Sequence, residues 1–212
     1  MKNRGKFITF EGSEGAGKTT QINLLKDYLN SKGIEVVTTR EPGGTLLAEK
    51  LREIIKHFQG DEKVSDKTEL LLMEAARNQH VVNVIEKSLS AGKWVICDRF
   101  YDSTTAYQGY GRGMDLKFIE KLNNFAVDNA KPDLTVYFDL PLEVGFARTR
   151  VRYANQEVFD RFESQKIEFY QRIEQGFKDI AANNSDRVKI IDASLSIEEV
   201  HQQIRRLIDE QL

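Results

Sequence analysis

The fold is decided by the apolar run Phe7-Ile8-Thr9-Phe10 and the stretch Gly12-Ser13-Glu14-Gly15-Ala16-Gly17-Lys18-Thr19. A β-prone run that leads into the pattern G-x-x-x-x-G-K-[ST], with helical spacing directly after it, is the context in which this pattern binds phosphates. The glycines let backbone N–H groups turn inward, and the helix that follows adds positive charge at its N-terminus. A plain glycine-rich turn is the alternative. The flanking strand and helix favour a nucleoside triphosphate site.

Two side chains of this loop have expected roles in phosphate chemistry. Lys18 would place its charge on the β- and γ-phosphates, and the Thr19 hydroxyl is suited to bind Mg²⁺. Asp98 ends a later apolar run, where an acidic residue is a usual second magnesium ligand, although an aspartate there can also cap a helix. The predicted metal residues are therefore Thr19 and Asp98. The predicted ATP-binding residues are Gly12, Ser13, Glu14, Gly15, Ala16, Gly17, Lys18, Thr19 and Thr20.

Short apolar runs alternate with helical patterns along the whole chain. Because most of these runs are nearly continuous, they are typical of strands in a parallel sheet that is covered on both faces. The expected strands are 7–10, 34–39, 94–97, 134–138 and 188–191, and helical patterns follow residue 18 and cover 68–89, 169–177 and 197–207. Gly33 and Gly92 stand where C-terminal glycine caps of helices belong. We predict a three-layer α/β fold and a single domain over residues 1–212.

Composition excludes several classes of protein. The 212 residues carry 31 Lys+Arg and 33 Asp+Glu, so the formal net charge of -2 gives no basic excess for binding nucleic acid or a membrane surface. Cys97 is the one cysteine, which excludes an intrachain disulfide and a multi-cysteine zinc site. No run approaches 18 uncharged apolar residues, so no membrane span is expected. We therefore expect a cytoplasmic protein.

The motif leaves the reaction open, and other residues narrow it. Residues 129–133 do not match the Asn-Lys-x-Asp pattern of guanine-binding switches, and no Leu-Ser-Gly-Gly-Gln signature of transporter ATPases is present. A small phosphotransferase must hold a second anion. Arg40 and Arg99 each follow an expected strand, and together they could chelate an acceptor phosphate at the ligand-binding edge of the sheet. The alternative class is a nucleotide-binding switch without an acceptor.

Six stretches in order along the chain resemble bacterial thymidylate kinases. They are residues 12–20, Thr39-Arg40-Glu41-Pro42-Gly43-Gly44-Thr45, 69–77, 98–109, 131–134 and 160–161. The resemblance implies transfer of the ATP γ-phosphate to dTMP, giving dTDP and ADP for dTTP biosynthesis. It also implies the strand order 2-3-1-4-5 and a homodimer. A kinase for another deoxynucleotide remains the alternative, and the apolar stretch 70–89 could form either a dimer interface or part of the core.

The same resemblance implies roles for acceptor-site residues. Arg99 and Arg40 would hold the dTMP phosphate, and Glu14 would face the sugar near its 3′-hydroxyl. The base and sugar would be lined by Arg77 at the thymine edge, Ser103, Thr104 and Gln108 around the base, and Tyr107 against the sugar.

One position departs from the family pattern. Met73 stands where the family usually has an aromatic residue stacked on thymine. Methionine gives a polarizable but flexible contact, so the hypothesis is a looser grip on the base.

A basic segment between two helical patterns is a candidate lid, at about 148–161. Helical periodicity pauses after Arg148, Arg150 and Arg152, where polar residues 153–156 follow. The phosphate loop has no basic residue among positions 13–16, so charge developing on the transferred group needs another partner. The three arginines are therefore catalytic candidates with Lys18 and Arg99, although their alternate spacing lets one or two reach the phosphates. A solvated charged surface is the alternative. No general base is needed, because the acceptor phosphate is already a nucleophile.

Overall fold

The computed structural model describes residues 4–153 and 166–212. The strands are β1 (Phe7–Gly12), β2 (Val36–Arg40), β3 (Trp94–Asp98), β4 (Leu134–Asp139) and β5 (Val188–Asp192). The helices before β3 are α1 (Lys18–Ser31), α2 (Leu46–His57), α3 (Asp66–His80), the π-helical turn η1 (Val81–Ile85) and α4 (Glu86–Ser90). The later helices are α5 (Tyr101–Thr104), the π-helical turn η2 (Thr105–Gly111), α6 (Leu116–Val127), α7 (Leu142–Tyr153), α8 (Ile167–Asn183) and α9 (Ile197–Asp209).

All five strands are parallel and lie in the order β2-β3-β1-β4-β5, which confirms the predicted fold class and strand order. The central strand β1 is buried along its whole length, as its continuous apolar pattern requires. β1 pairs with β3 on one side and with β4 on the other. The carboxyl ends of β1, β3 and β2 therefore meet at one edge of the sheet, and the phosphate loop begins there.

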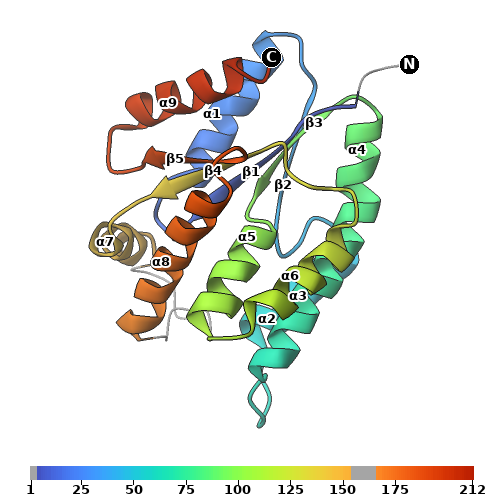
Figure 1. The fold of residues 1–212 in the computed structure, drawn as a ribbon, viewed down its shortest axis with the longest axis vertical. Coiled ribbons are helices and arrows are strands. Elements are labelled where there is room, and N and C mark those ends of the chain that lie inside the picture. Colours follow the sequence, from blue (N-terminus) through green and yellow to red (C-terminus); the bar gives the residue numbers. More distant parts are fainter. Residues whose placement is uncertain (1–3, 154–165) are drawn as a thin grey trace.

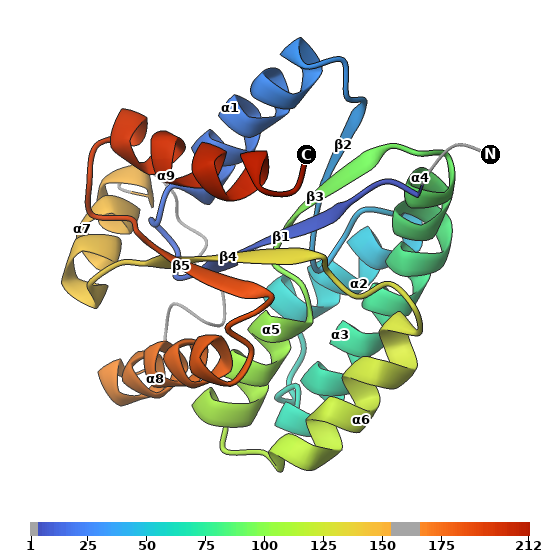
Figure 2. The same ribbon diagram turned by 45° about the horizontal axis from the view of Figure 1, so that its top comes forward.

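Helices cover both faces of the sheet. α1 and α9 lie on one face, and α3, α5, α6 and α8 lie on the other (Figures 1 and 2). Leu25 and Leu29 of α1 pack with Ile204 of α9 and Ile8 of β1 in one buried cluster. None of the helices within residues 4–153 and 166–212 is long and apolar enough to cross a membrane.

Among the helices that the sequence patterns did not predict are α2 and α6. Each begins at a side-chain cap: Thr45 accepts from the N–H of Ala48, and Asp115 accepts from the N–H groups of Lys117 and Phe118. These helices matter for function because α2 forms a wall of the cavity described below, and Asn123 of α6 accepts a hydrogen bond from Arg77, which lines the same cavity.

The three arginines of the candidate lid lie on α7, which continues to Tyr153, and residues 154–156 of the expected pause lie outside the described residues. The arginines there are good helix formers, and Thr149 donates to the carbonyl of Gly145 one turn earlier, so nothing local ends the helix. α7 also lies close to the phosphate loop, since a Cβ on Gly15 would stand 2.6 Å from the Gly145 carbonyl oxygen. Residues 154–161 of the predicted lid lie outside the described residues.

Candidate active site

A cavity of about 640 Å³ opens at the carboxyl ends of β1, β2 and β3. Almost all the predicted site residues line it: Ser13, Glu14, Gly15, Ala16, Gly17, Lys18, Thr19, Thr20, Arg40, Met73, Arg77, Asp98, Arg99, Ser103, Thr104, Tyr107, Gln108 and Arg150. Gly12 and Arg148 do not line it, and the side chain of Arg152 lies outside the described part of the chain. The loop residues and the acceptor-side residues thus share one cavity.

Lys18 is the first residue of α1, and its ammonium group lies against the phosphate loop. Its Nζ donates to the carbonyls of Gly12 at 3.2 Å and Ser13 at 2.9 Å, and it stands 3.9 Å from a carboxylate oxygen of Asp98. Burial lowers the pKa of Lys18 to about 8, the charge of Arg99 acts in the same direction, and nearby carboxylates including Asp98 oppose them. A buried ammonium held by carbonyls is ready to exchange these contacts for phosphate oxygens.

The residues beside Lys18 fit a hydrated magnesium ion. Within the described residues, Asp98 Oδ1 and Ser13 Oγ are buried and have no hydrogen-bond partner. Thr19, the second residue of α1, is exposed and lines the same cavity. Carboxylate and hydroxyl oxygens are hard ligands, and one or two such groups are what Mg²⁺ with bound phosphates takes from a protein.

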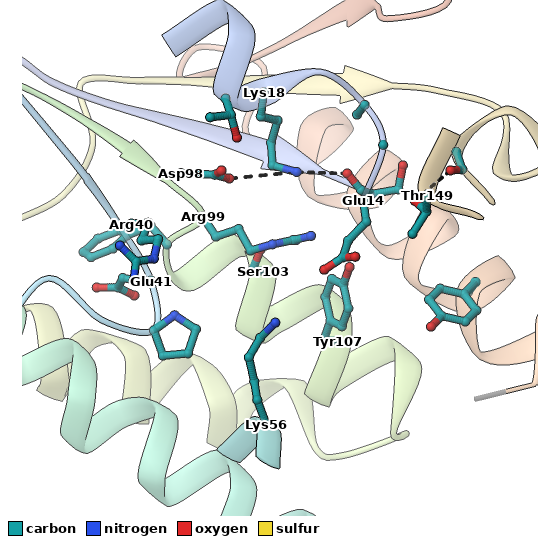
Figure 3. Close-up of a pocket in the computed structure, with 18 of the residues that line it drawn as sticks. Glu14, Lys18, Arg40, Glu41, Lys56, Asp98, Arg99, Ser103, Tyr107 and Thr149 are labelled. Carbon is teal, nitrogen blue, oxygen red and sulfur yellow. Dashed lines mark hydrogen bonds and ion pairs between the residues drawn. The ribbon is translucent and has the colours of Figure 1, made fainter. Parts of the chain in front are cut away.

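Arg99 reaches into the middle of the cavity, between Lys18 and Tyr107 (Figure 3). Its backbone is left-handed, with φ at 67°, which turns the chain sharply away from β3. Its Nη1 donates to Ser103 Oγ at 3.2 Å, and its guanidinium lies 5.1 Å from the centre of the Tyr107 ring. Burial opposes the charge, but Tyr107, Asp98 and Glu14 together raise the pKa of Arg99 above its usual range. Arg99 is therefore a permanent cation facing the cavity.

Glu11 holds this turn, and the sequence patterns did not identify it. Its carboxyl group is fully buried and accepts from the N–H of Phe100 at 2.7 Å and from the hydroxyl of Ser103 at 2.5 Å. Burial raises the pKa of Glu11 to about 8, the charge of Asp102 raises it further, and the hydrogen bond from Ser103 and the charge of Arg99 oppose both. Glu11 precedes the phosphate loop directly, so one side chain links that loop to the turn that carries Arg99.

Arg77 is held by partners from four different segments. Its Nε donates to Glu41 at 2.8 Å, and Nη1 donates to Glu74 at 2.6 Å and to Asn123 at 3.1 Å. Nη2 donates to Thr104 at 2.8 Å. Four of the five guanidinium hydrogens are thus used by the protein. The arrangement presents a rigid donor to the cavity, and it explains why Arg77 is almost fully buried.

Glu41 also holds His80, a histidine near the end of α3. His80 is fully buried, with Nδ1 3.0 Å from Glu41 and Nε2 2.7 Å from the hydroxyl of Thr39. This contact joins α3 to the segment after β2 and supports a structural role for His80.

The two arginines predicted to hold an acceptor phosphate do not have the same surroundings. Arg99 faces the cavity centre, whereas Arg40 lies at its side, next to Glu41 (Figure 3). Arg40 is exposed and donates to Glu49 of α2 at 2.9 Å. Glu49 in turn accepts from the N–H of Gly44. Arg40 must leave or share Glu49 to bind a ligand.

Two arginines of α7, Arg148 and Arg150, also differ in their surroundings. Arg150 lines the cavity. Arg148 does not line it, and donates instead to the backbone carbonyls of Gly15 and Ala193. Helical spacing places the two side chains in different directions, as expected for residues two apart.

Helix α2 supplies cavity residues that sequence reasoning missed. Lys56 rises from the wall opposite the phosphate loop (Figure 3). Arg52 and Ile55 also line the cavity, and Arg52 donates to the Pro42 carbonyl. The spacing of 52, 55 and 56 marks one face of a helix, so a helical pattern recognised at 46–57 would have found them.

The chain is similar to known proteins over nearly its full length. The thymidylate kinase family model matches residues 10–204. Thymidylate kinases of Trichodesmium erythraeum and Sulfurihydrogenibium sp. are 47% and 48% identical to it, and the alignments cover 98% and 93% of this chain and 96% and 93% of theirs. The crystal structure of thymidylate kinase from Ehrlichia chaffeensis matches with a TM-score of 0.76 at 39% identity, over 97% of this chain and 99% of that one.

The chain belongs to the thymidylate kinase family. Membership confirms the resemblance that the motifs suggested, and it makes the chain a nucleotide-binding kinase of nucleotide biosynthesis. The thymidylate kinase fold also accounts for the position of the cavity, because open α/β sheets bind ligands beyond the carboxyl ends of their strands.

Proposed function

We propose that this protein transfers the γ-phosphate of ATP to dTMP, giving dTDP and ADP. The observation that carries the proposal is the single cavity in which Lys18 of the phosphate loop and Arg99 of the acceptor side both take part. A switch that only binds a triphosphate has no use for a second buried cation there. Family membership supports dTMP as the acceptor.

The donor half would bind ATP through residues 12–20. Backbone N–H groups and Lys18 would hold the phosphates, and Thr19 and Asp98 would hold Mg²⁺. When bound with the nucleotide, Mg²⁺ neutralises charge on the β- and γ-phosphates. Arg150 is better placed than Arg148 to meet charge on the transferred group, since it lines the cavity. Arg148 would need to leave its carbonyl partners to do so, and Arg152 remains a candidate from the sequence.

The acceptor half would orient dTMP for in-line attack. Arg99, with Arg40, would hold its phosphate, and Glu14 would face the 3′-hydroxyl. Arg77, Ser103, Thr104 and Gln108 would surround the base, with Met73 against its face and Tyr107 against the sugar. The phosphate of dTMP is mostly dianionic at pH 7, so positioning and charge neutralisation are the main catalytic requirements.

The wider setting is also part of the proposal. We propose that residues 1–212 form one domain that acts in the cytoplasm as a homodimer and binds neither nucleic acid nor membranes. Five exposed apolar side chains on α3, η1 and α6 support an interface on that side: Leu71, Val82, Leu116, Phe118 and Phe125. The first two belong to the apolar stretch 70–89 that the sequence singled out.

An ADP-release assay with ATP and Mg²⁺ tests the function. Each nucleoside monophosphate is supplied in turn, and dTMP is expected to give the highest kcat/KM. Preference for another deoxynucleotide would change the acceptor, and ADP release without any acceptor dependence would overturn the kinase assignment.

A further inference from the structure

Arg77 and Gln108, two polar side chains in the proposed base pocket, differ in whether the group that they offer to a ligand depends on their orientation. Arg77 carries only donors, so its role does not depend on orientation. Gln108 carries an amide with one oxygen acceptor and two N–H donors, and it can present either end to a ligand. What Gln108 offers to a base therefore depends on what holds the other end of its amide.

The end that faces away from the cavity is held by Glu69. Gln108 Nε2 donates to Glu69 Oε1 at 2.9 Å. Glu69 is fully buried in α3 and does not line the cavity, whereas Gln108 does. Arg112 follows η2, and its Nη2 lies 3.0 Å from Glu69 Oε2 while its Nε lies 3.4 Å from Oε1.

This arrangement allows one orientation of the amide. A carboxylate paired with a guanidinium accepts hydrogen bonds and does not donate them. If the Gln108 amide turned over, its oxygen would face a carboxylate oxygen in a buried site, where an unpaired and repulsive polar contact is costly. Gln108 Oε1 is thus left as the acceptor available to the cavity.

We propose that Glu69, held by Arg112, is a positioning residue that fixes the Gln108 amide oxygen toward the base and so selects bases with an N3–H donor. A donor from Arg77 beside an acceptor from Gln108 matches a carbonyl next to an N–H, which thymine and uracil present. Cytosine presents an amino group next to an unprotonated nitrogen, the opposite pattern. This inference rests on the proposed function, because it assumes that the acceptor base lies against Gln108.

A purely structural role for the Glu69–Arg112 pair is the competing explanation. The pair joins α3 to the end of η2, and Arg112 also lies 3.4 Å from Asp66 and 5.0 Å from the centre of the Phe169 ring. A structural link would change activity with every acceptor by the same factor. A link that orients Gln108 changes the ratio between acceptors.

The test compares kcat/KM for dTMP with that for dCMP in four proteins: wild type, Glu69→Gln, Gln108→Leu, and the double variant. Glutamine at 69 keeps the shape but can donate as well as accept, so the Gln108 amide is free to turn. We expect Glu69→Gln to lower the ratio of kcat/KM for dTMP to that for dCMP about tenfold. This is the size of effect expected when one hydrogen bond to the base is lost because an acceptor has been replaced by a donor. In the Gln108→Leu background the same change is expected to leave the ratio unaltered, because the residue being oriented is gone.

An unchanged ratio in Glu69→Gln overturns the proposal, and so does an equal shift in the Gln108→Leu background. Thermal unfolding shows whether each variant folds. Should Glu69→Gln fail to fold, Arg112→Gln takes its place: it keeps Glu69 but removes its cation, and the ratio is expected to fall by a smaller factor. An unaltered ratio in folded Arg112→Gln then overturns the proposal. Failure of the proposed function can be told apart from failure of this inference, because the wild-type protein itself would then show no preference for dTMP.

Discussion

The donor half and the acceptor half of the cavity are built in different ways. The donor half is one continuous stretch, in which backbone groups and Lys18 surround the phosphate position. The acceptor half gathers Arg77 and Arg99 from segments far apart in the chain and holds each through buried carboxylates. One half depends on local backbone conformation, and the other depends on packing between helices.

This difference has consequences for mutation. In the proposed function, a change in the loop removes a group that would meet phosphate directly. A change behind the acceptor half, at Glu11 or Glu41, removes an acceptor from a buried network and leaves its partners unsatisfied. The first kind should act on catalysis with little effect on folding, and the second should act on folding and binding together.

The largest expected effect is that of Lys18→Ala. Loss of the buried ammonium removes charge stabilisation at the transferred group, so kcat/KM should fall by two to three orders of magnitude. The KM for dTMP should change little, because Lys18 belongs to the donor half. Steady-state kinetics with Lys26→Ala as a control on the same helix measure this, and near-normal turnover would contradict the assigned role.

Arg99→Ala should be nearly as severe but should act on the other substrate. Removing a buried cation that faces the acceptor is expected to lower kcat/KM by about a hundredfold and to raise the KM for dTMP. The affinity for ATP should remain close to that of wild type. If ATP binding weakens as much as dTMP binding, the division of the cavity into two halves is wrong.

Glu11→Gln tests the link between the halves through stability. The pKa of Glu11 is raised from 4.5 to about 8 in the folded protein, so the folded state keeps a proton that the unfolded chain loses. Its contribution to stability is full below pH 4.5 and is lost as pH rises through about 8. Glutamine does not titrate, so the variant should lack this loss. The difference in unfolding free energy between variant and wild type should therefore move in favour of the variant by about 2–4 kcal/mol as pH rises over this range.

Urea unfolding of Glu11→Gln at pH 5 and pH 8 gives this difference. Glu120→Gln is the control, because Glu120 is exposed on α6. A pH dependence identical to that of wild type would mean that Glu11 is not the group responsible.

The smallest expected effect is that of Met73→Phe. An aromatic ring against the base should lower the KM for dTMP by about threefold to tenfold, within the range of aromatic–base stacking. Lys67→Phe is the matched control, since Lys67 is exposed on the same helix. An unchanged KM would mean that Met73 already grips the base as well as a ring does, and the hypothesis of a loose grip would be abandoned.

Much of the fold could be predicted because its signals are local. The five apolar runs and the phosphate-loop pattern depend on neighbouring residues only, and the strands appear where they were expected. Helix α2 was missed, and with it Lys56, although Leu47, Leu51 and Ile55 recur every four residues after the Thr45 cap.

The sequence by itself determined the sheet, the phosphate loop and the kinds of residue at the acceptor side. The sheet and the phosphate loop follow from spacing along the chain, where turn chemistry and periodicity act over a few residues, whereas the acceptor-side residues were implied by the resemblance to a known family. Only the tertiary structure decided that Glu11 holds the turn of Arg99, that Arg40 pairs with Glu49, and that Glu69 orients Gln108. Those contacts join residues 9 to 89 positions apart, and their energy comes from burial that exists only after the helices have packed.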